Sequence, residues 1–140
     1  MTPLYRMMHE WARTPFVWGQ SDCCLVVADW YQALWGVDPA AHLRGTYHDA
    51  LTCRKTGWFA NPVKVVDDVL APCERGVEID TPTPGSVAVI QVARAGGNYC
   101  VGAIWLGTVW GVKGPDGVTT LHPRQTFMRK AWDIGYDPQS

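Results

Sequence analysis

The chain has 140 residues, of which 47% are hydrophobic and 18% charged, and its formal net charge at pH 7 is −1. This length suits one domain around a single core, which we expect to span residues 1–140. The charge lacks the basic excess that binding a nucleic-acid backbone requires, so no nucleic-acid partner is expected. No run of about 18 apolar residues is present, which argues against a membrane-spanning helix.

The first segment, Met1 to Arg13, mixes charged and apolar residues and is predicted to form an amphipathic helix rather than a signal peptide. Synthesis in a bacterial cytoplasm is therefore expected. The five cysteines form no C-x-x-C pair, and their odd number argues against a disulfide framework, so reduced thiols are predicted. The eight tryptophans indicate either a large aromatic core or a surface that docks on another protein.

The stretch Pro15 to Cys24 leads into an apolar segment, Leu25 to Trp35, that is predicted to be a buried helix. Ser21 or Asp22 can cap this helix by accepting hydrogen bonds from its free backbone N–H groups. Cys23 would then lie where those N–H groups and the helix dipole favour a thiolate. Chemistry alone leaves Cys23 evenly balanced between a structural role and that of a nucleophile.

The following segments predict helices first and strands second, which is typical of the α+β class. The predicted helices are a short one from Pro39 to Arg44-Gly45, Tyr47 to Lys55, and Asn61 to Leu70. The predicted strands are Val87 to Val92, Tyr99 to Leu106, Thr108 to Lys113, Val118 to Leu121 and Ala131 to Ile134, with a turn at Ala93 to Asn98. We therefore expect N-terminal helices packed on a C-terminal antiparallel sheet.

Several short motifs carry a resemblance to a known family. Pro15 to Gly19, a polar spacer and Asp22-Cys23 before a hydrophobic helix resemble the nucleophile segment of NlpC-type cell-wall peptidases, a papain-like group. Five pieces also resemble a family of short phage and prophage proteins related to that group: Trp18 to Cys24, Gly36 to Ala41, Leu43 to Gly45, Gly114 to Gly117 and Ala131-Trp132. The resemblance covers nearly the whole chain. It implies a papain-like single domain with Cys23 as nucleophile and with Phe16, Trp18 and Asp22 as substrate-binding candidates.

The resemblance breaks down at the catalytic base. A papain-like mechanism needs an imidazole within hydrogen-bond reach of the thiol and a polar group that orients the ring. The family's histidine begins a strand that reads His-Val-Gly-Ile, and the matching stretch here, Cys100 to Ile104, has cysteine in its place. The orienting residue is expected about a dozen positions later, where Trp110, Gly111 and Val112 cannot do that work. Phe16 for tyrosine and Ser86 for aspartate are two smaller departures.

Another histidine could replace the missing base. His122 is the candidate, because it comes from the sheet half of the chain and could fold back toward Cys23. His9, His42 and His48 are predicted to be surface or capping residues. The catalytic candidates are therefore Cys23, Cys100 and His122.

Three functional hypotheses follow. The favoured one is a structural component of a phage tail, at its tip, that keeps the peptidase fold without its base; its partners would be other tail proteins and its location the virion. The alternative is an active cysteine endopeptidase or amidase that cleaves host peptidoglycan during DNA entry, with Cys23 and His122. The third is a metal-binding or redox module of Cys23, Cys24 and Cys100. We predict no metal site and no cofactor.

Overall fold

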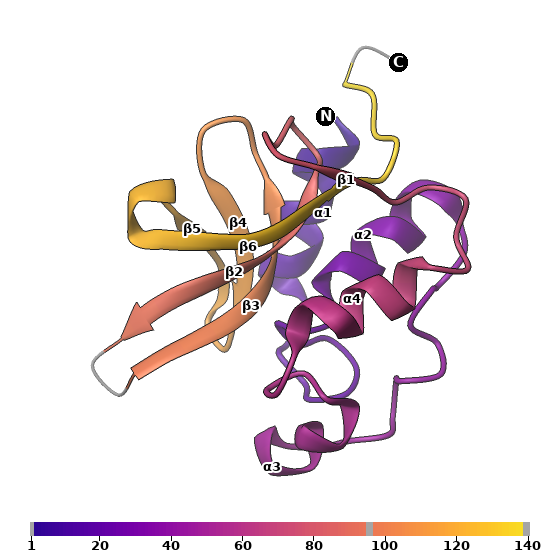
Figure 1. The fold of residues 1–140 in the computed structure, drawn as a ribbon, viewed down its shortest axis with the longest axis vertical. Coiled ribbons are helices and arrows are strands. Elements are labelled where there is room, and N and C mark those ends of the chain that lie inside the picture. The colour runs from indigo at the N-terminus through magenta and orange to yellow at the C-terminus, as the bar shows by residue number, and fades with distance from the viewer. Residues whose placement is uncertain (1, 95–96, 139–140) are drawn as a thin grey trace.

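Four α-helices precede six β-strands in the computed structural model, which describes residues 2–94 and 97–138. The helices are α1 (Pro3–Arg13), α2 (Val26–Trp35), α3 (Ala50–Cys53) and α4 (Pro62–Leu70). The strands are β1 (Val77–Ile79), β2 (Val87–Arg94), β3 (Gly97–Trp105), β4 (Trp110–Gly114), β5 (Gly117–Leu121) and β6 (Thr126–Asp133). All pair antiparallel, in the order β1-β6-β2-β3-β4-β5 (Figure 1). The predicted α+β class with an antiparallel sheet is confirmed.

Local signals set the bounds of the well-predicted helices. Thr2 caps α1 by accepting from the backbone N–H of Tyr5, and the apolar positions of α1 face the core. Asn61 caps α4 in the same way, and Pro62 occupies its first position, where a missing N–H is harmless. Helix α2 ends at Gly36, whose φ of 75° is the left-handed conformation that glycine adopts without strain.

Two predicted helices are wrong or too long. Residues 39–45 form successive turns rather than a helix, because most backbone hydrogen bonds there join residues three positions apart. The side chain of Arg44 also forms ion pairs with Asp38 and Asp29. The predicted helix Tyr47 to Lys55 shrinks to α3 and one 3-10 turn, since Asp49 begins the helix and Gly57 ends the turn. The chain from Gly36 to Gly57 is therefore mostly turns.

The sheet holds more strand than the sequence predicted. Strand β1 was not predicted, and β6 begins five residues before the predicted Ala131. A β-bulge where β6 passes Val89 and Ile90 interrupts its alternation, which hides the strand pattern in the sequence. The predicted turn Ala93 to Asn98 narrows, because β2 and β3 pair as far as Arg94 and Gly97. Residues 95–96 of that turn lie outside the described residues.

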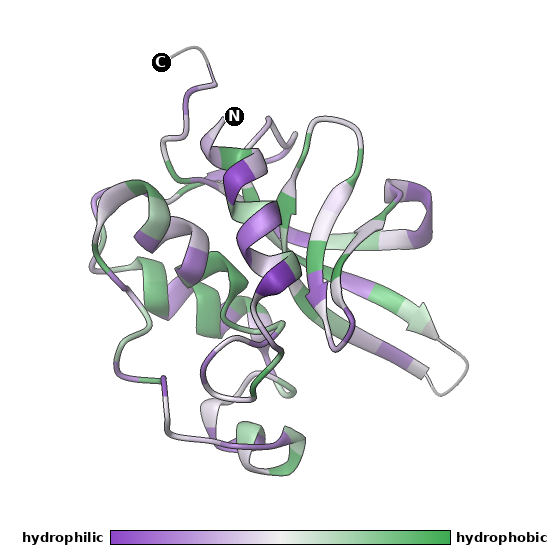
Figure 2. Ribbon diagram, turned by 180° about the vertical axis from the view of Figure 1, so that it is seen from behind, coloured by the Kyte–Doolittle hydropathy of each residue, from purple (hydrophilic) through white to green (hydrophobic). Residues whose placement is uncertain are grey.

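The two faces of the sheet pack against different partners. One face packs on α1, α2 and α4, and its core includes Val87, Val89 and Ile104. In Figure 2, α1 lies in front of the sheet, and its exposed residues include Arg6, Glu10 and Arg13. The other face is covered by the curl of the sheet itself, because side chains from all six strands meet there in one cluster around Ile90 and Trp110.

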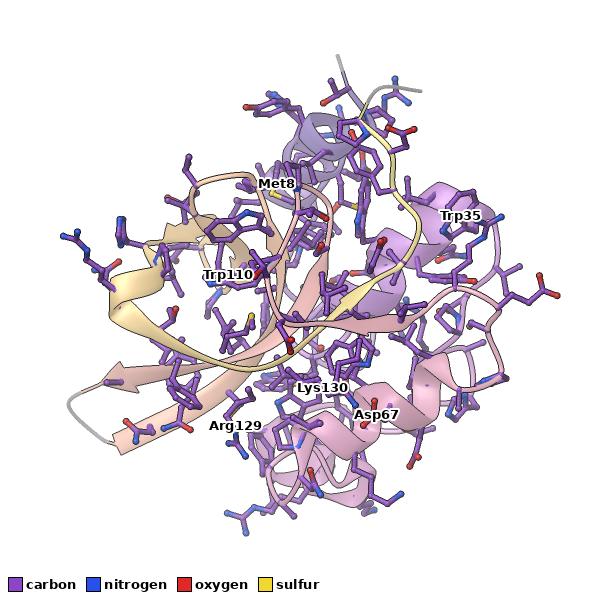
Figure 3. The ribbon with its side chains drawn as sticks, turned by 45° about the horizontal axis from the view of Figure 1, so that its top comes forward. Met8, Trp35, Asp67, Trp110, Arg129 and Lys130 are labelled. Carbon is purple, nitrogen blue, oxygen red and sulfur yellow. The ribbon has the colours of Figure 1, made fainter. Side chains whose placement is uncertain are left out.

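Tryptophan side chains connect the helices to the sheet region. Three indole N–H groups donate to backbone carbonyls: Trp30 to Gly85, Trp35 to Ile134 and Trp58 to Cys100. Trp132 donates to Asp67 of α4, which also pairs with Lys130 over 2.9 Å (Figure 3). Of the two uses predicted for the eight tryptophans, the core use is the one observed, since each is buried or partly buried.

Candidate functional site

A buried carboxylate organises the turn that precedes α2. Asp22 is fully buried, and its two oxygens accept from the backbone N–H groups of Gly19, Cys24 and Leu25 and from the hydroxyl of Tyr47. Four donors satisfy both oxygens, so the carboxylate is well compensated for its burial. The prediction that Ser21 or Asp22 caps α2 is wrong in detail, because α2 has Leu25 at its N-cap with no side-chain hydrogen bond, and Asp22 binds the turn just before it. A substrate-binding role for Asp22 stays a prediction.

The backbone before this turn fits only one residue type. Gly19 has a φ of 83°, and a Cβ there would collide with the carbonyl oxygen of Tyr47. The phenol ring of Tyr47 packs edge-on against Trp18, which packs in turn on Phe16 at 5.2 Å between ring centroids. Phe16 and Trp18 are partly exposed and support the turn from outside. Their substrate-binding role stays a prediction.

Arg44 ties the turn to the following segment. Its guanidinium contacts Asp29 at 2.8 Å and Asp38 at 2.6 Å, and it donates to the backbone carbonyl of Gln20. The three ion-pair side chains are less than one-fifth exposed, so these contacts are better shielded from solvent than surface pairs. Arg44 therefore fixes the polar spacer of the Cys23 turn relative to α2.

The Cys23 turn lies against strand β3. Strand β3 pairs with β4 only at Ile104 and Trp105. Earlier in β3, the N–H of Gly102 donates to the carbonyl of Cys23 over 3.1 Å. A Cβ on Gly102 would lie 2.5 Å from Cγ2 of Val26. The absence of a side chain at Gly102 thus lets the start of α2 approach the sheet.

The backbones of Cys23 and of the Cys100 strand are adjacent, but their side chains pack into different clusters. Cys23 packs against the cluster inside the curled sheet, whereas Cys100 packs on the helix-facing core. The sulfur of Cys100 lies 4.0 Å from a guanidinium nitrogen of Arg129, and its carbonyl accepts from Trp58. Within residues 2–94 and 97–138, no hydrogen bond joins Cys23 to Cys100.

Cys100 lines an open cavity of about 490 Å³. Its other lining residues are Trp58, Phe59, Gln91, Asn98 and Tyr99. Phe59 is exposed in the cavity wall, and Phe127, also exposed, pairs in the sheet with Gln91 of the lining. Arg129 donates a hydrogen bond to the side chain of Gln91. The cavity combines an aromatic wall with amides and one thiol, and the part of the chain that is described shows no imidazole in its lining.

The histidine kept as a substitute base is placed elsewhere. His122 is exposed at the end of β5, where its Nδ1 accepts from the backbone N–H of Arg124 and caps a 3-10 turn, Pro123–Gln125. No interaction joins it to Cys23 in the described ranges. His9, His42 and His48 are exposed as well, as the sequence predicted. The residues at the expected orienting position, Trp110 to Val112, are buried in β4.

Cys23 has sulfur neighbours instead of a base. Its Sγ lies 4.0 Å from Sγ of Cys24. The thiols of Cys23 and Cys53, together with burial, raise the pKa of the Cys24 thiol. The Cys24 thiol in turn lowers the pKa of Cys53. All five cysteines are free.

The described residues hold no cluster of metal ligands and no helix that could span a membrane. Across residues 2–94 and 97–138, no three His, Cys, Asp or Glu side chains gather as a metal site would require. In the same ranges, none of the helices has both the length and the hydrophobicity that crossing a bilayer demands. The third hypothesis, a metal-binding or redox module of Cys23, Cys24 and Cys100, stays a prediction.

A second cavity, of about 350 Å³, lies between α1, α2 and β4. Lys113 is buried in its wall and donates to the carbonyls of Trp11 and Thr14, so its ammonium satisfies the C-terminal end of α1. Asp29 also lines this cavity. Its burial, partly offset by Arg44, raises its pKa to about 6.

Three residues of the site were missed in the sequence: Arg44, Tyr47 and Cys53. Arg44 and Tyr47 lie more than twenty positions after the turn they contact, and no local pattern marks them.

The fold and site define an α+β domain. In it, a turn that contains Cys23 and is held by the Asp22 carboxylate precedes a buried helix, and this helix packs on an antiparallel sheet. The chain belongs to the family described as Domain of unknown function (DUF6950), whose model matches residues 2–134. No curated protein and no solved structure matches it.

Proposed function

We propose that this protein is a structural component of a phage tail, at the tail tip, with a papain-like fold of the NlpC type that has lost its catalytic base. The observation that carries the proposal is the pairing of Cys23 with Gly102. It sets the Cys23 turn beside the strand that the resemblance expects to hold the base, and the sequence of that strand has Cys100 in place of the family's histidine.

The arrangement of helices and sheet supports the fold part of the proposal. A cysteine turn leads into a buried helix, and that helix packs on an antiparallel sheet whose third strand touches the turn. This is the geometry that the resemblance to NlpC-type peptidases implies. Fold likeness alone does not carry function, so the proposal depends on the site.

The site argues against turnover of a peptide bond. A thiol attacks a carbonyl efficiently only when a neighbouring base removes its proton and later protonates the leaving amine. The described neighbours of Cys23 are a second thiol, apolar strand residues and the carboxylate of Asp22. The two oxygens of that carboxylate already accept hydrogen bonds from four donors. The peptidase alternative with His122 is not favoured, because His122 is exposed and occupied as a cap.

The open cavity beside Cys100 supports docking of a partner. Aromatic residues and arginine are enriched at the centres of protein interfaces, and this region offers Phe59, Phe127 and Arg129 at the surface. In a tail assembly the partner would be another tail protein. Phe59→Ser together with Phe127→Ser is expected to reduce incorporation into particles while leaving the isolated fold unchanged.

The decisive experiment compares chemistry with assembly in a phage or prophage that carries the gene. Deletion of the gene should prevent formation of infectious particles, whereas Cys23→Ser should assemble and infect at the wild-type level. The purified protein should release no fragments from peptidoglycan beyond those released by Cys23→Ser. Particles of Cys23→Ser that assemble but fail to deliver DNA, with peptidoglycan cleavage by the wild type, would overturn the structural proposal.

A further inference from the structure

The outer edge of strand β3 is open over part of its length. Strand β3 pairs with β2 from Gly97 to Ile104, but with β4 only at Ile104 and Trp105. In Figure 1, the outer half of the β2–β3 hairpin extends away from the helices. An exposed strand edge is a template on which another extended chain can pair.

The backbone groups along this edge show where such a chain would bind. The N–H of Gly102 donates to Cys23 and therefore points away from β2. Because backbone groups alternate in direction along a strand, those of Cys100 and Asn98 point the same way. The carbonyl of Cys100 already accepts from the indole of Trp58. In residues 2–94 and 97–138, no group bonds to the N–H of Cys100 or to either backbone group of Asn98, so these stay free for a partner.

The cavity of about 490 Å³ lies beside the same edge. Its lining includes Asn98 and Cys100 of the edge together with the exposed ring of Phe59. Side chains alternate between the two faces of a strand, so every second side chain of an added segment would face this cavity. The edge and the cavity together fit an extended peptide rather than a helix, because a helix has no backbone groups free to pair along its length.

The charge of this region favours an acidic partner. Residues 54–66, 81–115 and 117–132 include the whole cavity lining and contain basic residues but no Asp or Glu. Arg129 is exposed, lies 4.0 Å from the sulfur of Cys100, and has no carboxylate partner in the described ranges. A second copy of this chain would bring the same acid-free region opposite, so like charges would meet. A segment with carboxylates is complementary instead.

We propose that the open edge of β3 binds an extended, acidic peptide segment of a partner protein. The segment adds a strand beside Asn98 and Cys100 and places a carboxylate near Arg129. In this mode of recognition, main-chain hydrogen bonds supply affinity, and pockets for alternate side chains supply specificity. The inference rests on the docking part of the proposed function and names the chemistry of the partner.

Selection of short random peptides on the purified protein tests the inference. The peptides that bind should be rich in Asp and Glu, and a synthetic copy of one should shift the NMR signals of the Asn98 and Cys100 backbone amides. Methylation of alternate backbone nitrogens in that peptide should abolish binding, because it removes the donors that pair with the edge. No selected binder, binders without an acidic bias, NMR shifts confined to other residues, or preferential binding of single-stranded DNA would each overturn the inference.

Variants then locate the contacts. Asn98→Pro removes one N–H at a strand edge, where proline is tolerated, and should weaken peptide binding roughly tenfold or more. Arg129→Gln should weaken binding about fivefold at low salt, whereas Arg13→Gln, at an exposed position of α1, is the matched control and should change it less than about twofold.

The outcomes separate this inference from the tail proposal. Unchanged peptide affinity in Asn98→Pro, with its fold checked by circular dichroism, would overturn the inference and leave the tail proposal standing. Deletion of the gene that leaves infectious particles intact would overturn the tail proposal, whereas peptide binding by the purified protein would still hold.

Discussion

The hydroxyl of Tyr47 donates a hydrogen bond of 2.6 Å to Oδ2 of Asp22, and both residues are buried. Tyr47→Phe removes this donor while keeping the ring that packs on Trp18. One oxygen of a buried carboxylate then loses a partner, so we expect a loss of about 1–3 kcal/mol in the free energy of unfolding, measured by urea denaturation. Tyr5→Phe, at an exposed position, is the control and should change stability by less than about 0.5 kcal/mol.

Asp22→Asn tests the whole set of contacts around the carboxylate. An amide keeps one acceptor oxygen but turns an N–H₂ group toward backbone donors that now lack a partner. A destabilisation of about 2–4 kcal/mol is expected, larger than that of Tyr47→Phe. In the double variant the two losses should not add, because Tyr47 and Asp22 share one hydrogen bond. Strict additivity would show that the two side chains act independently.

Gly102→Ala tests the contact between α2 and β3. The added methyl group lies 2.5 Å from Cγ2 of Val26, so α2 must move or the side chain must shift. We expect a destabilisation of about 1–3 kcal/mol by thermal or urea unfolding. Val26→Ala makes room and should cost less in the Gly102→Ala background than in the wild type. Equal costs in both backgrounds would contradict the packing described for this contact.

Asp29 gives the fold a specific pH dependence. Burial raises its pKa from the ordinary value of 3.8 to about 6, despite the opposing effect of Arg44. The folded protein therefore holds this proton more tightly than the unfolded chain, and the stability gained from it is present below pH 4 and lost as the pH rises through 6. The stability of the wild type relative to Asp29→Asn should thus fall by roughly 3 kcal/mol between pH 4 and 7. A difference that rises with pH would show that Arg44 dominates.

The parts of the fold that follow from local chemistry could be predicted from the sequence. Helix α4 begins at its Asn61 cap, and α2 ends at Gly36, both as expected from single residues. Strand β1 could not be predicted, because it has three residues and Val77 is largely exposed. It exists only because β6 pairs with it.

The site was likewise predictable only in its local part. The Asp22-Cys23 turn belongs to one short stretch of sequence, so its position before α2 could be predicted. Its partners Tyr47 and Cys53 could not be predicted, because they reach the turn through tertiary packing that follows no spacing rule in the sequence. The exposed position of His122 likewise depends on where β5 ends, which only the folded sheet defines.

The bonds between the two halves of the chain also set an order on its folding. Lys113 closes the end of α1 across 102 positions, and the indole of Trp35 reaches Ile134 across 99. Contacts of such long range form slowly and cannot form before both partners exist. On the ribosome, the N-terminal helices must therefore wait for almost the entire chain to emerge. The newly made helical half would expose its apolar faces throughout that interval and is the species that chaperones would meet.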